Sequence, residues 1–387
     1  MGYRILTLNN ISVRGLERLP RERYEVASEI GKPDAILVRS ADMHSMQIPE
    51  TVLAVGRAGA GTNNVPVAAL SRRGVPVFNA PGANANAVKE LVIAGMLLSA
   101  RNIADALAFT ATLPAEGGEE LMEKEKKRFV GGELIGRTLG VIGLGAIGVR
   151  VANAARALGM RVIGFDPHMT VEGAWALSSD VIKAGSMNEV YAGSDFISFH
   201  VPLNDATRGS FALASLDVVK PGVVLLNFSR DGIVAHDAIQ AGLGDGRIGR
   251  YVTDFPKPEY RGNPRVIGLP HLGASTAEAE ENCALMVVDQ LREFLENGNV
   301  VNSVNFPTTR MHRAGKARIC VANANKPNMI GQLSATLGAA GINIAQMHNA
   351  SRGDHAYNLV DVDNEVGPAV VEQLRAIDGV LSVRVIG

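Results

Sequence analysis

The sequence predicts an α/β protein with two parallel-sheet lobes and a smaller βαββαβ module at the C-terminal end. Over roughly the first 300 residues, strand-like apolar runs alternate with helix-like stretches, the order of a parallel sheet covered by helices. Glycine is abundant, at 42 of 387 residues, which suits the tight turns between such elements. The final stretch, from about residue 317, follows the strand and helix order of a ferredoxin-like fold.

The first lobe is expected to open directly on a strand. Its expected strands are residues 3–8, 35–38, 52–55 and 75–78, with a helix at 66–73 and a long helix from 85 to about 108. The charged stretch 114–129 is typical of a solvated helix face or a linker. We assign residues 1–98 and 283–306 to this lobe, which is therefore discontinuous.

The second lobe is assigned to residues 99–282, and its strands should end at polar residues. Its expected strands are 137–142, 161–165, 196–199, 223–228 and 251–254. A long helix at 277–296 and an Asn/Gly/Pro-rich linker through 309 come next. The C-terminal module, assigned to residues 316–387, has expected strands at 317–322, 342–347, 356–362 and 380–385 and helices at 329–340 and 368–377.

Composition narrows the class of protein. A formal net charge of -1 argues against nucleic-acid binding, which needs a surplus of Lys and Arg. Cys283 and Cys320 form no spaced framework, so we expect a reducing cytoplasm and no metal site. The longest apolar run, residues 91–98, is too short to span a bilayer, and no signal peptide is visible. We therefore expect a soluble cytoplasmic protein with no membrane partner.

A glycine motif predicts a dinucleotide site. Gly143-Leu144-Gly145-Ala146-Ile147-Gly148 follows an apolar strand directly and opens a helix that Gly159 ends. The first glycine permits a tight turn, the second lets the backbone approach a pyrophosphate, and the third lets helix and strand pack closely. Asp166 ends the next strand, where its carboxylate can accept bonds from ribose hydroxyls and would repel a 2′-phosphate. We therefore predict a Rossmann-like lobe that binds NAD.

Three residues at strand ends predict hydride transfer from a hydroxyl-bearing carbon. This chemistry needs a base for the hydroxyl proton, a partner for that base and a cation for the neighbouring carboxylate. Arg230 follows one apolar strand, Glu259 lies just beyond another, and His271 stands before a helix start. Each alone has a structural alternative, such as a surface ion pair or a solvated carboxylate. Their combined order and spacing favour a catalytic set.

These residues resemble the D-isomer-specific 2-hydroxyacid dehydrogenases over nearly the whole chain. The most specific pieces are Pro270-His271-Leu272-Gly273-Ala274-Ser275-Thr276 and the Arg-to-Glu spacing of 29, from 230 to 259. The resemblance implies that His271 is the acid/base and that Glu259 holds its imidazole and stabilises its charged form. It implies that Arg230 binds the substrate carboxylate and polarises the C2 oxygen. One departure is Asp231 at a usual glycine, which either weakens the pull of Arg230 or faces solvent.

The same resemblance extends the cofactor set. Asp254 would accept a hydrogen bond from the nicotinamide carboxamide, and Val201 and Pro202 would line the adenosine side. The full expected set is Gly143, Gly145, Ala146, Ile147, Gly148, Asp166, Val201, Pro202, Phe228, Ser229, Arg230, Asp254, His271, Gly273 and Ala274.

Substrate contacts are expected from the first lobe. Arg39 and Ser40 follow a buried strand at the carboxyl end, where α/β sheets place ligands, and the loop with Arg57, Gly59 and Ala60 offers backbone N–H groups. The resemblance adds Asn84 and directs Arg39 at a phosphate, which points to the branch that oxidises D-3-phosphoglycerate for serine synthesis. Lys89, in an otherwise apolar helix, either forms a structural pair or supplies a second cation for the phosphate.

The C-terminal module resembles an ACT domain, a module that often binds amino acids at a dimer interface. Asn323, Asn325 and Asn343 match effector contacts, and the implied effector is L-serine. Asn323 replaces a histidine of some relatives and Asn328 a turn glycine, so a module that only dimerises stays open. We expect a homodimer or homotetramer. Two other functions also stay open: a glyoxylate or hydroxypyruvate reductase, and a non-catalytic NAD-sensing protein.

Overall fold

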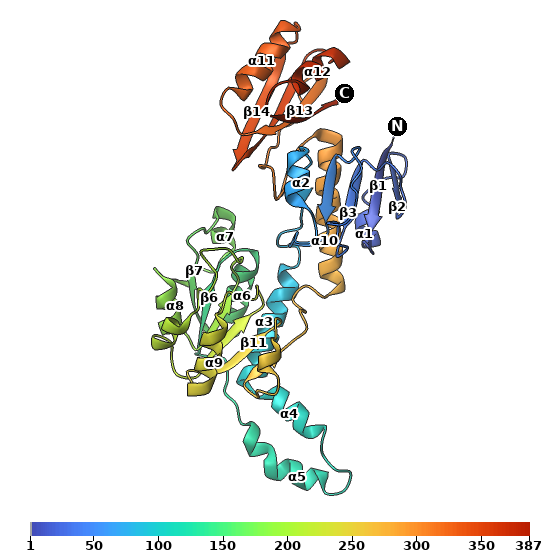
Figure 1. Ribbon diagram of the computed structural model, residues 1–387. Coiled ribbons are helices and arrows are strands. Elements are labelled where there is room, and N and C mark those ends of the chain that lie inside the picture. Colours follow the sequence, from blue (N-terminus) through green and yellow to red (C-terminus); the bar gives the residue numbers. More distant parts are fainter. Residues whose placement is uncertain (1) are drawn as a thin grey trace. The chain divides into compact units, whose positions relative to one another are not determined.

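The computed structural model describes residues 2–387, which form two compact units. One unit joins the described residues up to Asn84 with Ala277–Gly387, and the other is Ala85–Thr276. The first unit holds a five-stranded and a four-stranded sheet, and the second holds a seven-stranded sheet (Figure 1). Every strand pair in the five- and seven-stranded sheets is parallel, which confirms the predicted α/β class.

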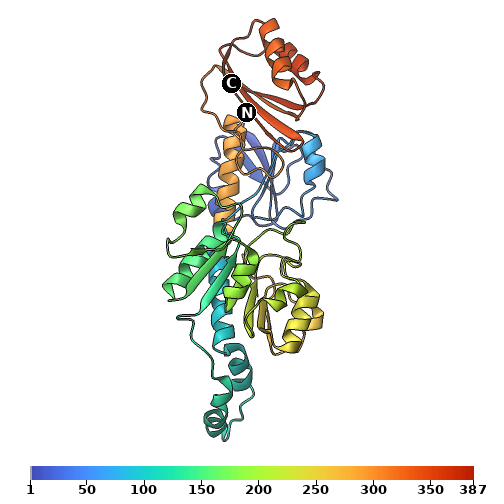
Figure 2. The same ribbon diagram turned by 90° about the vertical axis from the view of Figure 1, so that its left-hand side faces the viewer.

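The five-stranded sheet has the strand order of a flavodoxin-like fold, β2-β1-β3-β4-β5. Its strands are β1 (Tyr3–Leu8), β2 (Tyr24–Ala27), β3 (Ala35–Val38), β4 (Ala54–Arg57) and β5 (Val77–Phe78), with helices α1 (Val13–Leu16) and α2 (Val67–Arg72). All four residues of β3 are buried, since it is a central strand with both faces covered. Helix α10 (Ala277–Asn297) packs on this sheet through a buried apolar stripe that includes Val287 and Leu291, and Figure 2 shows it beside the strands.

The seven-stranded sheet has the order β12-β11-β10-β9-β6-β7-β8, a Rossmann order with one additional strand. Its strands are β6 (Thr138–Ile142), β7 (Arg161–Phe165), β8 (Ile182–Lys183), β9 (Phe196–Phe199), β10 (Val223–Asn227), β11 (Ile248–Thr253) and β12 (Val266–Gly268). The helices that connect these strands are α6 (Ala146–Ala157), α7 (Val171–Ala176), α8 (Met187–Gly193), α9 (His236–Asp245), η2 (Leu213–Asp217) and η3 (Pro258–Tyr260). The order reverses between β6 and β9, so this edge of the sheet is the expected ligand crevice.

The predicted helix from 85 to about 108 is wrong as a single element. It is two helices, α3 (Ala85–Ala100) and α4 (Ile103–Thr110), bent by 70° at the break. Asn102 causes the break because it has a left-handed backbone (φ 51°), and its side chain bonds the Val130 carbonyl and the Arg250 guanidinium. Within residues 2–387 no single helix is long and apolar enough to cross a membrane, and only this bent pair meets the criterion jointly.

The stretch that follows, expected to be a solvated helix or linker, contains α5 (Gly118–Glu125) and the 3₁₀ helix η1 (Lys126–Phe129). Its charged side chains are mostly exposed, and two ion pairs join neighbouring turns, Lys126 with Glu123 and Arg128 with Glu125. Helices α4 and α5 extend away from the seven-stranded sheet as an arm (Figures 1 and 2).

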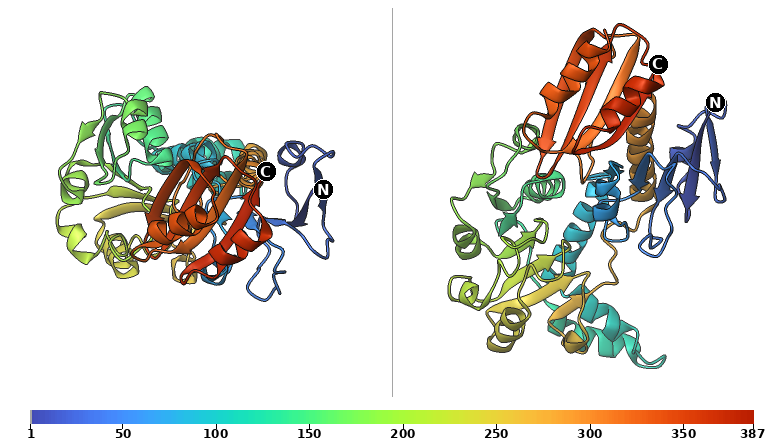
Figure 3. Two further views of the ribbon diagram at one scale, coloured as in Figure 1. Left: turned by 90° about the horizontal axis from the view of Figure 1, so that it is seen from above. Right: turned by 45° about the horizontal axis from the view of Figure 1, so that its top comes forward.

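The C-terminal module has the predicted ferredoxin-like order, β14-β15-β13-β16 with antiparallel pairing. Its elements are β13 (Ala317–Ala324), α11 (Met329–Ala339), β14 (Ile344–Arg352), β15 (His355–Val362), α12 (Pro368–Arg375) and β16 (Val380–Ile386). Helices α11 and α12 cover one face of the sheet (Figure 3), where Leu333 and Leu374 pack against Ile319 and Val321.

The other face of the four-stranded sheet packs directly against α10 and the residues that follow it. The expectation that the stretch through residue 309 is a linker is therefore wrong. Cys320, Tyr357 and Leu359 join one apolar core with Phe294 of α10 and with Phe306. Within the expected linker, Val300, Phe306 and Thr309 are fully buried, and Asn305 bonds the Val75 carbonyl. Its asparagines satisfy buried backbone groups through their side chains, so their abundance does not indicate an exposed segment.

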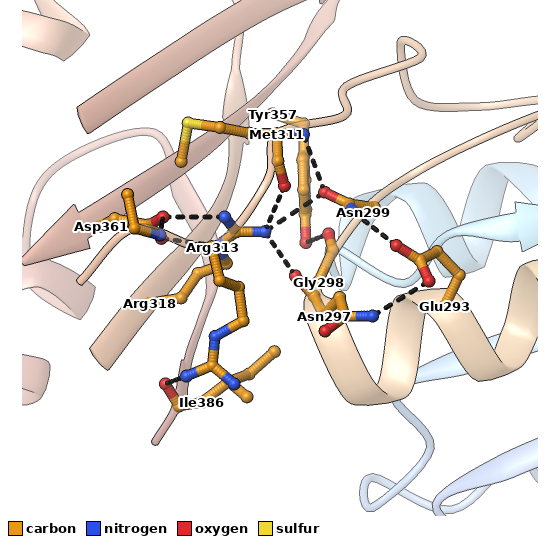
Figure 4. Close-up of polar contacts among 11 residues, drawn as sticks. Glu293, Asn297, Gly298, Asn299, Met311, Arg313, Arg318, Tyr357, Asp361 and Ile386 are labelled. Carbon is orange, nitrogen blue, oxygen red and sulfur yellow. Dashed lines mark hydrogen bonds and ion pairs between the residues drawn. The ribbon is translucent and has the colours of Figure 1, made fainter. Parts of the chain in front are cut away.

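A buried arginine ties the module to α10. Arg318 and Asp361 have 0% and 1% exposed side chains and form a two-bonded ion pair, at 2.6 and 2.8 Å. The other guanidinium nitrogen of Arg318 donates to the Asn297 and Met311 carbonyls and to the Asn299 amide oxygen, as Figure 4 shows. The module and the end of α10 are therefore joined by hydrogen bonds from a charged guanidinium as well as by apolar packing.

Candidate active site

The glycine motif forms a tight turn between β6 and α6. Gly143 has φ 92°, which disfavours any side chain, and a Cβ at Gly148 would lie 1.9 Å from the Gly143 carbonyl oxygen. Gly145 is the N-cap of α6, and a Cβ there would meet nothing within 4 Å. The start of this twelve-residue helix is thus open for an anionic group, which its N–H groups favour.

Asp166 closes the same site from the end of β7. Its Oδ2 accepts a bond from the Leu144 N–H at 2.8 Å, and its Oδ1 accepts one from the His168 N–H at 2.8 Å. It lines a cavity of about 780 Å³ together with Leu144, Pro167 and Met169. The carboxylate is therefore fixed beside the glycine turn, where the ribose of a dinucleotide is expected.

The predicted catalytic residues follow three adjacent strands. Arg230 comes after β10, Glu259 lies in η3 after β11, and His271 comes after β12, and these strands are neighbours in the order β12-β11-β10. Because the strands are parallel, their carboxyl ends meet at one edge of the sheet, the edge that also carries the glycine turn after β6. All these positions lie within the second unit.

Asp254 organises the loop that carries His271. Its carbonyl accepts a bond from the His271 N–H at 3.0 Å, and its Oδ2 accepts one from the Gly273 N–H at 3.0 Å. Burial raises the pKa of Asp254, and the Gly273 bond, His271 and Arg230 act in the opposite direction. Its Oδ1 is buried with no hydrogen-bond partner among the described residues, so it remains available as an acceptor, which the expected bond from a carboxamide N–H requires.

His271 and Glu259 lie on adjacent loops without a direct bond. The His271 imidazole is 4.8 Å from the Phe255 ring, centroid to centroid, and its residue has φ 48°. Across residues 2–387, no hydrogen bond or ion pair joins it to the exposed Glu259 carboxylate. Arg230 is also exposed, and its Nη1 donates to the Ser229 carbonyl at 2.7 Å. The structure thus places the three loops at one edge of the sheet, but the side chains of Arg230, Glu259 and His271 do not bond one another.

The comparisons with known proteins decide the family. Residues 93–273 match the model described as "D-isomer specific 2-hydroxyacid dehydrogenase, NAD binding domain". The chain is also 32% identical over 348 residues to the D-3-phosphoglycerate dehydrogenase of Haemophilus influenzae, covering 87% of this chain and 81% of that protein. The chain belongs to the D-isomer specific 2-hydroxyacid dehydrogenase family. The second unit is its NAD-binding domain, which confirms the predicted cofactor.

Two further relatives of this family define the extent of the match. The D-3-phosphoglycerate dehydrogenase of Methanocaldococcus jannaschii is 35% identical over 305 residues, which are 76% of this chain and only 56% of that protein. The NAD+-bound 3-phosphoglycerate dehydrogenase structure of Entamoeba histolytica has a TM-score of 0.60 at 24% identity, covering 79% of this chain and 99% of that chain. At that identity the structural match supports the fold alone.

In the first unit of this chain, most of the expected substrate residues lie at the ends of β3 and β4. Arg39 forms an ion pair with Glu280 of α10, and the Ser40 N–H donates to Asn9. Gly59 has φ 153°, and a Cβ there would lie 1.6 Å from an Arg57 guanidinium nitrogen, so glycine makes room for that side chain. The nearby Ala60 carbonyl accepts a bond from Asn79, and Asn84 ends this part of the unit.

Lys89 lies in α3 on the NAD-binding unit. Its Nζ is 3.5 Å from Glu90, and its side chain is 20% exposed. The preceding residue, Val88, is buried, and a Cβ at Gly273 would lie 3.6 Å from its Cγ2. The start of α3 therefore packs beside the His271 loop.

The expected effector residues do not come together within one chain. Asn323 is buried, and its Oδ1 accepts a bond from Asn358 at 2.6 Å while its amide donates to the Ala324 carbonyl. Asn325 bonds Gly353, near the start of β15, and Asn343 bonds Asp363, just past its end. Those ends are roughly 23 Å apart for an eight-residue strand.

Sequence reasoning missed two residues of this edge of the sheet. Lys257 lies 3.6 Å from Asp231, so the unusual carboxylate beside Arg230 has a lysine partner on the Glu259 loop. His200 follows β9, its Nε2 bonds Ser198 at 2.9 Å, and burial lowers its pKa to about 3. The only sequence signal for His200 was its place between a strand end and Val201-Pro202.

Proposed function

We propose that this chain oxidises D-3-phosphoglycerate to 3-phosphohydroxypyruvate with NAD, the first step of L-serine synthesis. The observation that carries the proposal is the convergence of Arg230, Asp254 and His271 at one sheet edge beside the glycine turn. Relatives named for this activity, at 32% and 35% identity, support the choice of substrate.

The proposed roles follow from where the side chains lie. The cofactor, when bound, accepts a hydride from C2 of the substrate. His271 takes the C2 hydroxyl proton, so that the products are the 2-keto acid, NADH and one proton. Arg230 binds the C1 carboxylate and polarises the C2 oxygen as the carbonyl forms. Asp254 fixes the face of the nicotinamide ring through its unpartnered Oδ1.

Glu259 is proposed to pair with His271 only once substrate is bound. Its loop and the His271 loop follow adjacent strands, and catalytic hydrogen bonds are often long in ligand-free structures. The Asp231–Lys257 ion pair links the Arg230 and Glu259 loops. Lys257 therefore offsets the negative charge of Asp231, which would otherwise weaken the attraction of Arg230 for the substrate carboxylate. Arg39, Arg57 and Lys89 are the proposed cations for the substrate phosphate and carboxylate.

We also propose that the chain works as a homodimer or a larger homo-oligomer in the cytoplasm. On the arm, Leu107 of α4 is 62% exposed and Leu121 and Met122 of α5 are 36% and 38% exposed, and this group of exposed apolar side chains supports an interface there. The outer strand β14 is mostly exposed along nine residues, with one edge unpaired. Pairing of two modules along that strand would let Asn325 of one copy and Asn343 of another share an L-serine molecule.

One assay tests the activity. NADH formation at 340 nm is compared for D-3-phosphoglycerate, D-glycerate and D-lactate, with and without L-serine. We expect a preference for the phosphorylated acid and inhibition by serine. Equal or better use of glyoxylate or hydroxypyruvate in the reverse direction would favour the reductase alternative.

A variant separates catalysis from cofactor sensing. We expect His271→Asn to lower kcat by about 10²–10⁴-fold, because the general base is lost, while NADH fluorescence titration gives near-normal binding. His312→Asn, at an exposed histidine of the first unit, is the matched control and should keep turnover. No turnover of any 2-hydroxy acid by the unmodified chain, with NADH still bound, would identify a sensor.

A further inference from the structure

The first unit contains a cavity that the proposed catalytic reaction does not use. It measures about 240 Å³ and lies between the outer face of the C-terminal sheet and the five-stranded half of the same unit. We call it the seam cavity and define it by Glu50, Arg73, Phe294, Arg375 and Arg384 among its lining residues. That volume is enough for several water molecules or one small metabolite.

The lining of the seam cavity is cationic. Arg73, Arg375 and Arg384 contribute three positive charges and Glu50 one negative charge, which leaves a formal charge of 3 − 1 = +2. The guanidinium groups of Arg73 and Arg384 donate to backbone carbonyls, and Arg384 also interacts with the Cys320 and Tyr357 side chains. Neither arginine has a carboxylate partner in the described chain. Only Arg375 has one, the Glu372 carboxylate at 2.7 Å.

Arg384 is the least satisfied of the three. Its guanidinium lies 4.3 Å from the centroid of the Phe294 ring, and its two outer nitrogens donate to the Phe294 and Leu295 carbonyls. Its Nε is buried and has no partner among residues 2–387. Carbonyl oxygens accept the hydrogen bonds but do not neutralise the charge, so the Arg384 guanidinium has no carboxylate counterion in the described chain.

We propose that the seam cavity binds a small anion carrying carboxylate or phosphate groups. The site is distinct from the asparagine positions expected for serine, because Asn325 and Asn343 lie at the two ends of β15 and neither lines the cavity. The occupant would contact both halves of the first unit at once, so its binding stabilises their packing.

The test uses thermal unfolding of the full chain titrated with inorganic phosphate, malonate or citrate, against NaCl at equal ionic strength. We expect a saturable rise in Tm at millimolar anion, and the most effective probe identifies the phosphate or carboxylate preference. Arg73→Gln/Arg375→Gln should weaken the apparent affinity at least tenfold. Glu50→Gln, an exposed change that removes the only negative charge, should strengthen it several-fold.

Two controls locate the effect. Arg39→Gln removes a proposed substrate cation and should leave the anion response intact, and Lys326→Gln removes an exposed cation of the same module that lies outside the cavity. The proposal is overturned if no anion exceeds NaCl, if Glu50→Gln weakens the response, or if only Arg39→Gln abolishes it. If Arg73→Gln/Arg375→Gln does not fold, the Glu50→Gln result decides alone.

Discussion

The buried Arg318–Asp361 pair gives the sharpest stability prediction. Arg318→Met removes both bonds to Asp361 and three further bonds, to Asn297, Asn299 and Met311. It also leaves the Asp361 carboxylate 1% exposed with no cation. Removing one partner of a buried pair typically costs about 3–5 kcal/mol, because the remaining charge stays desolvated. We expect a loss of that size in the free energy of opening the module.

The assay has to report on the C-terminal module itself. The only tryptophan, Trp175, lies in the other unit, so its fluorescence is unsuitable. Hydrogen exchange of the β13 and β15 amides measures the local opening, and a loss of 3–5 kcal/mol corresponds to exchange faster by roughly 10²–10³-fold or more. Arg318→Met/Asp361→Leu should recover much of the loss, since no unpaired charge remains.

The matched control is a surface ion pair of the same module. Lys326 and Asp378 are 2.9 Å apart but 49% and 92% exposed, so Lys326→Met should cost about 0–1 kcal/mol. If Arg318→Met costs no more than Lys326→Met, or if the two single losses at Arg318 and Asp361 simply add, the pair does not hold the module and the reasoning is refuted.

Four other perturbations test the site. Lys89→Ala should raise KM for D-3-phosphoglycerate about tenfold and leave KM for D-glycerate unchanged in steady-state assays, because one of the proposed phosphate cations is lost. Gly148→Ala should abolish NAD binding by calorimetry, since its Cβ would lie 1.9 Å from a carbonyl oxygen. Asp166→Ala should narrow the preference for NAD over NADP, measured as a kcat/KM ratio. Burial holds the pKa of His200 at about 3 against 6.5 when unfolded, so the unfolded chain binds an additional proton between those values. The free energy of unfolding that His200 contributes is therefore fully present above pH 6.5 and falls by roughly 2 kcal/mol from pH 7 to 5. Urea unfolding of His200→Leu should not show this fall.

The sequence predicted the elements whose pattern is set by burial. Strands 3–8, 35–38, 161–165 and 196–199 were placed to the residue, because their apolar runs end at polar or turn residues. The short edge strands β2, β8 and β12 were not predicted, since strands of two to four residues, some of them exposed, carry little periodic signal. The break at Asn102 depends on bonds to Val130 and Arg250, which no local pattern encodes.

The sequence allowed us to predict at which strand ends the candidate site residues lie, but not which of their side chains bond one another. The glycine turn and the strand-end residues follow from local spacing and parallel topology alone. The Lys257 partner of Asp231 and the buried Oδ1 of Asp254 depend on contacts between loops far apart in sequence. The burial of residues 297–309 was missed for the same reason, because Asn305 bonds the backbone of Val75 and Val77, which are far away in sequence.

The loop of His271 explains why Asp254 must sit one strand away. His271 has φ 48°, a conformation that costs about 1–2 kcal/mol for a residue with a side chain, so something must hold it. Asp254 does so twice, with its carbonyl on the His271 N–H and its Oδ2 on the Gly273 N–H. Its Oδ1 keeps no partner among the described residues, so in the proposed role one buried carboxylate would couple the His271 loop to a bound nicotinamide. The parallel neighbours β11 and β12 make this arrangement possible, since their carboxyl ends present Asp254 and His271 side by side.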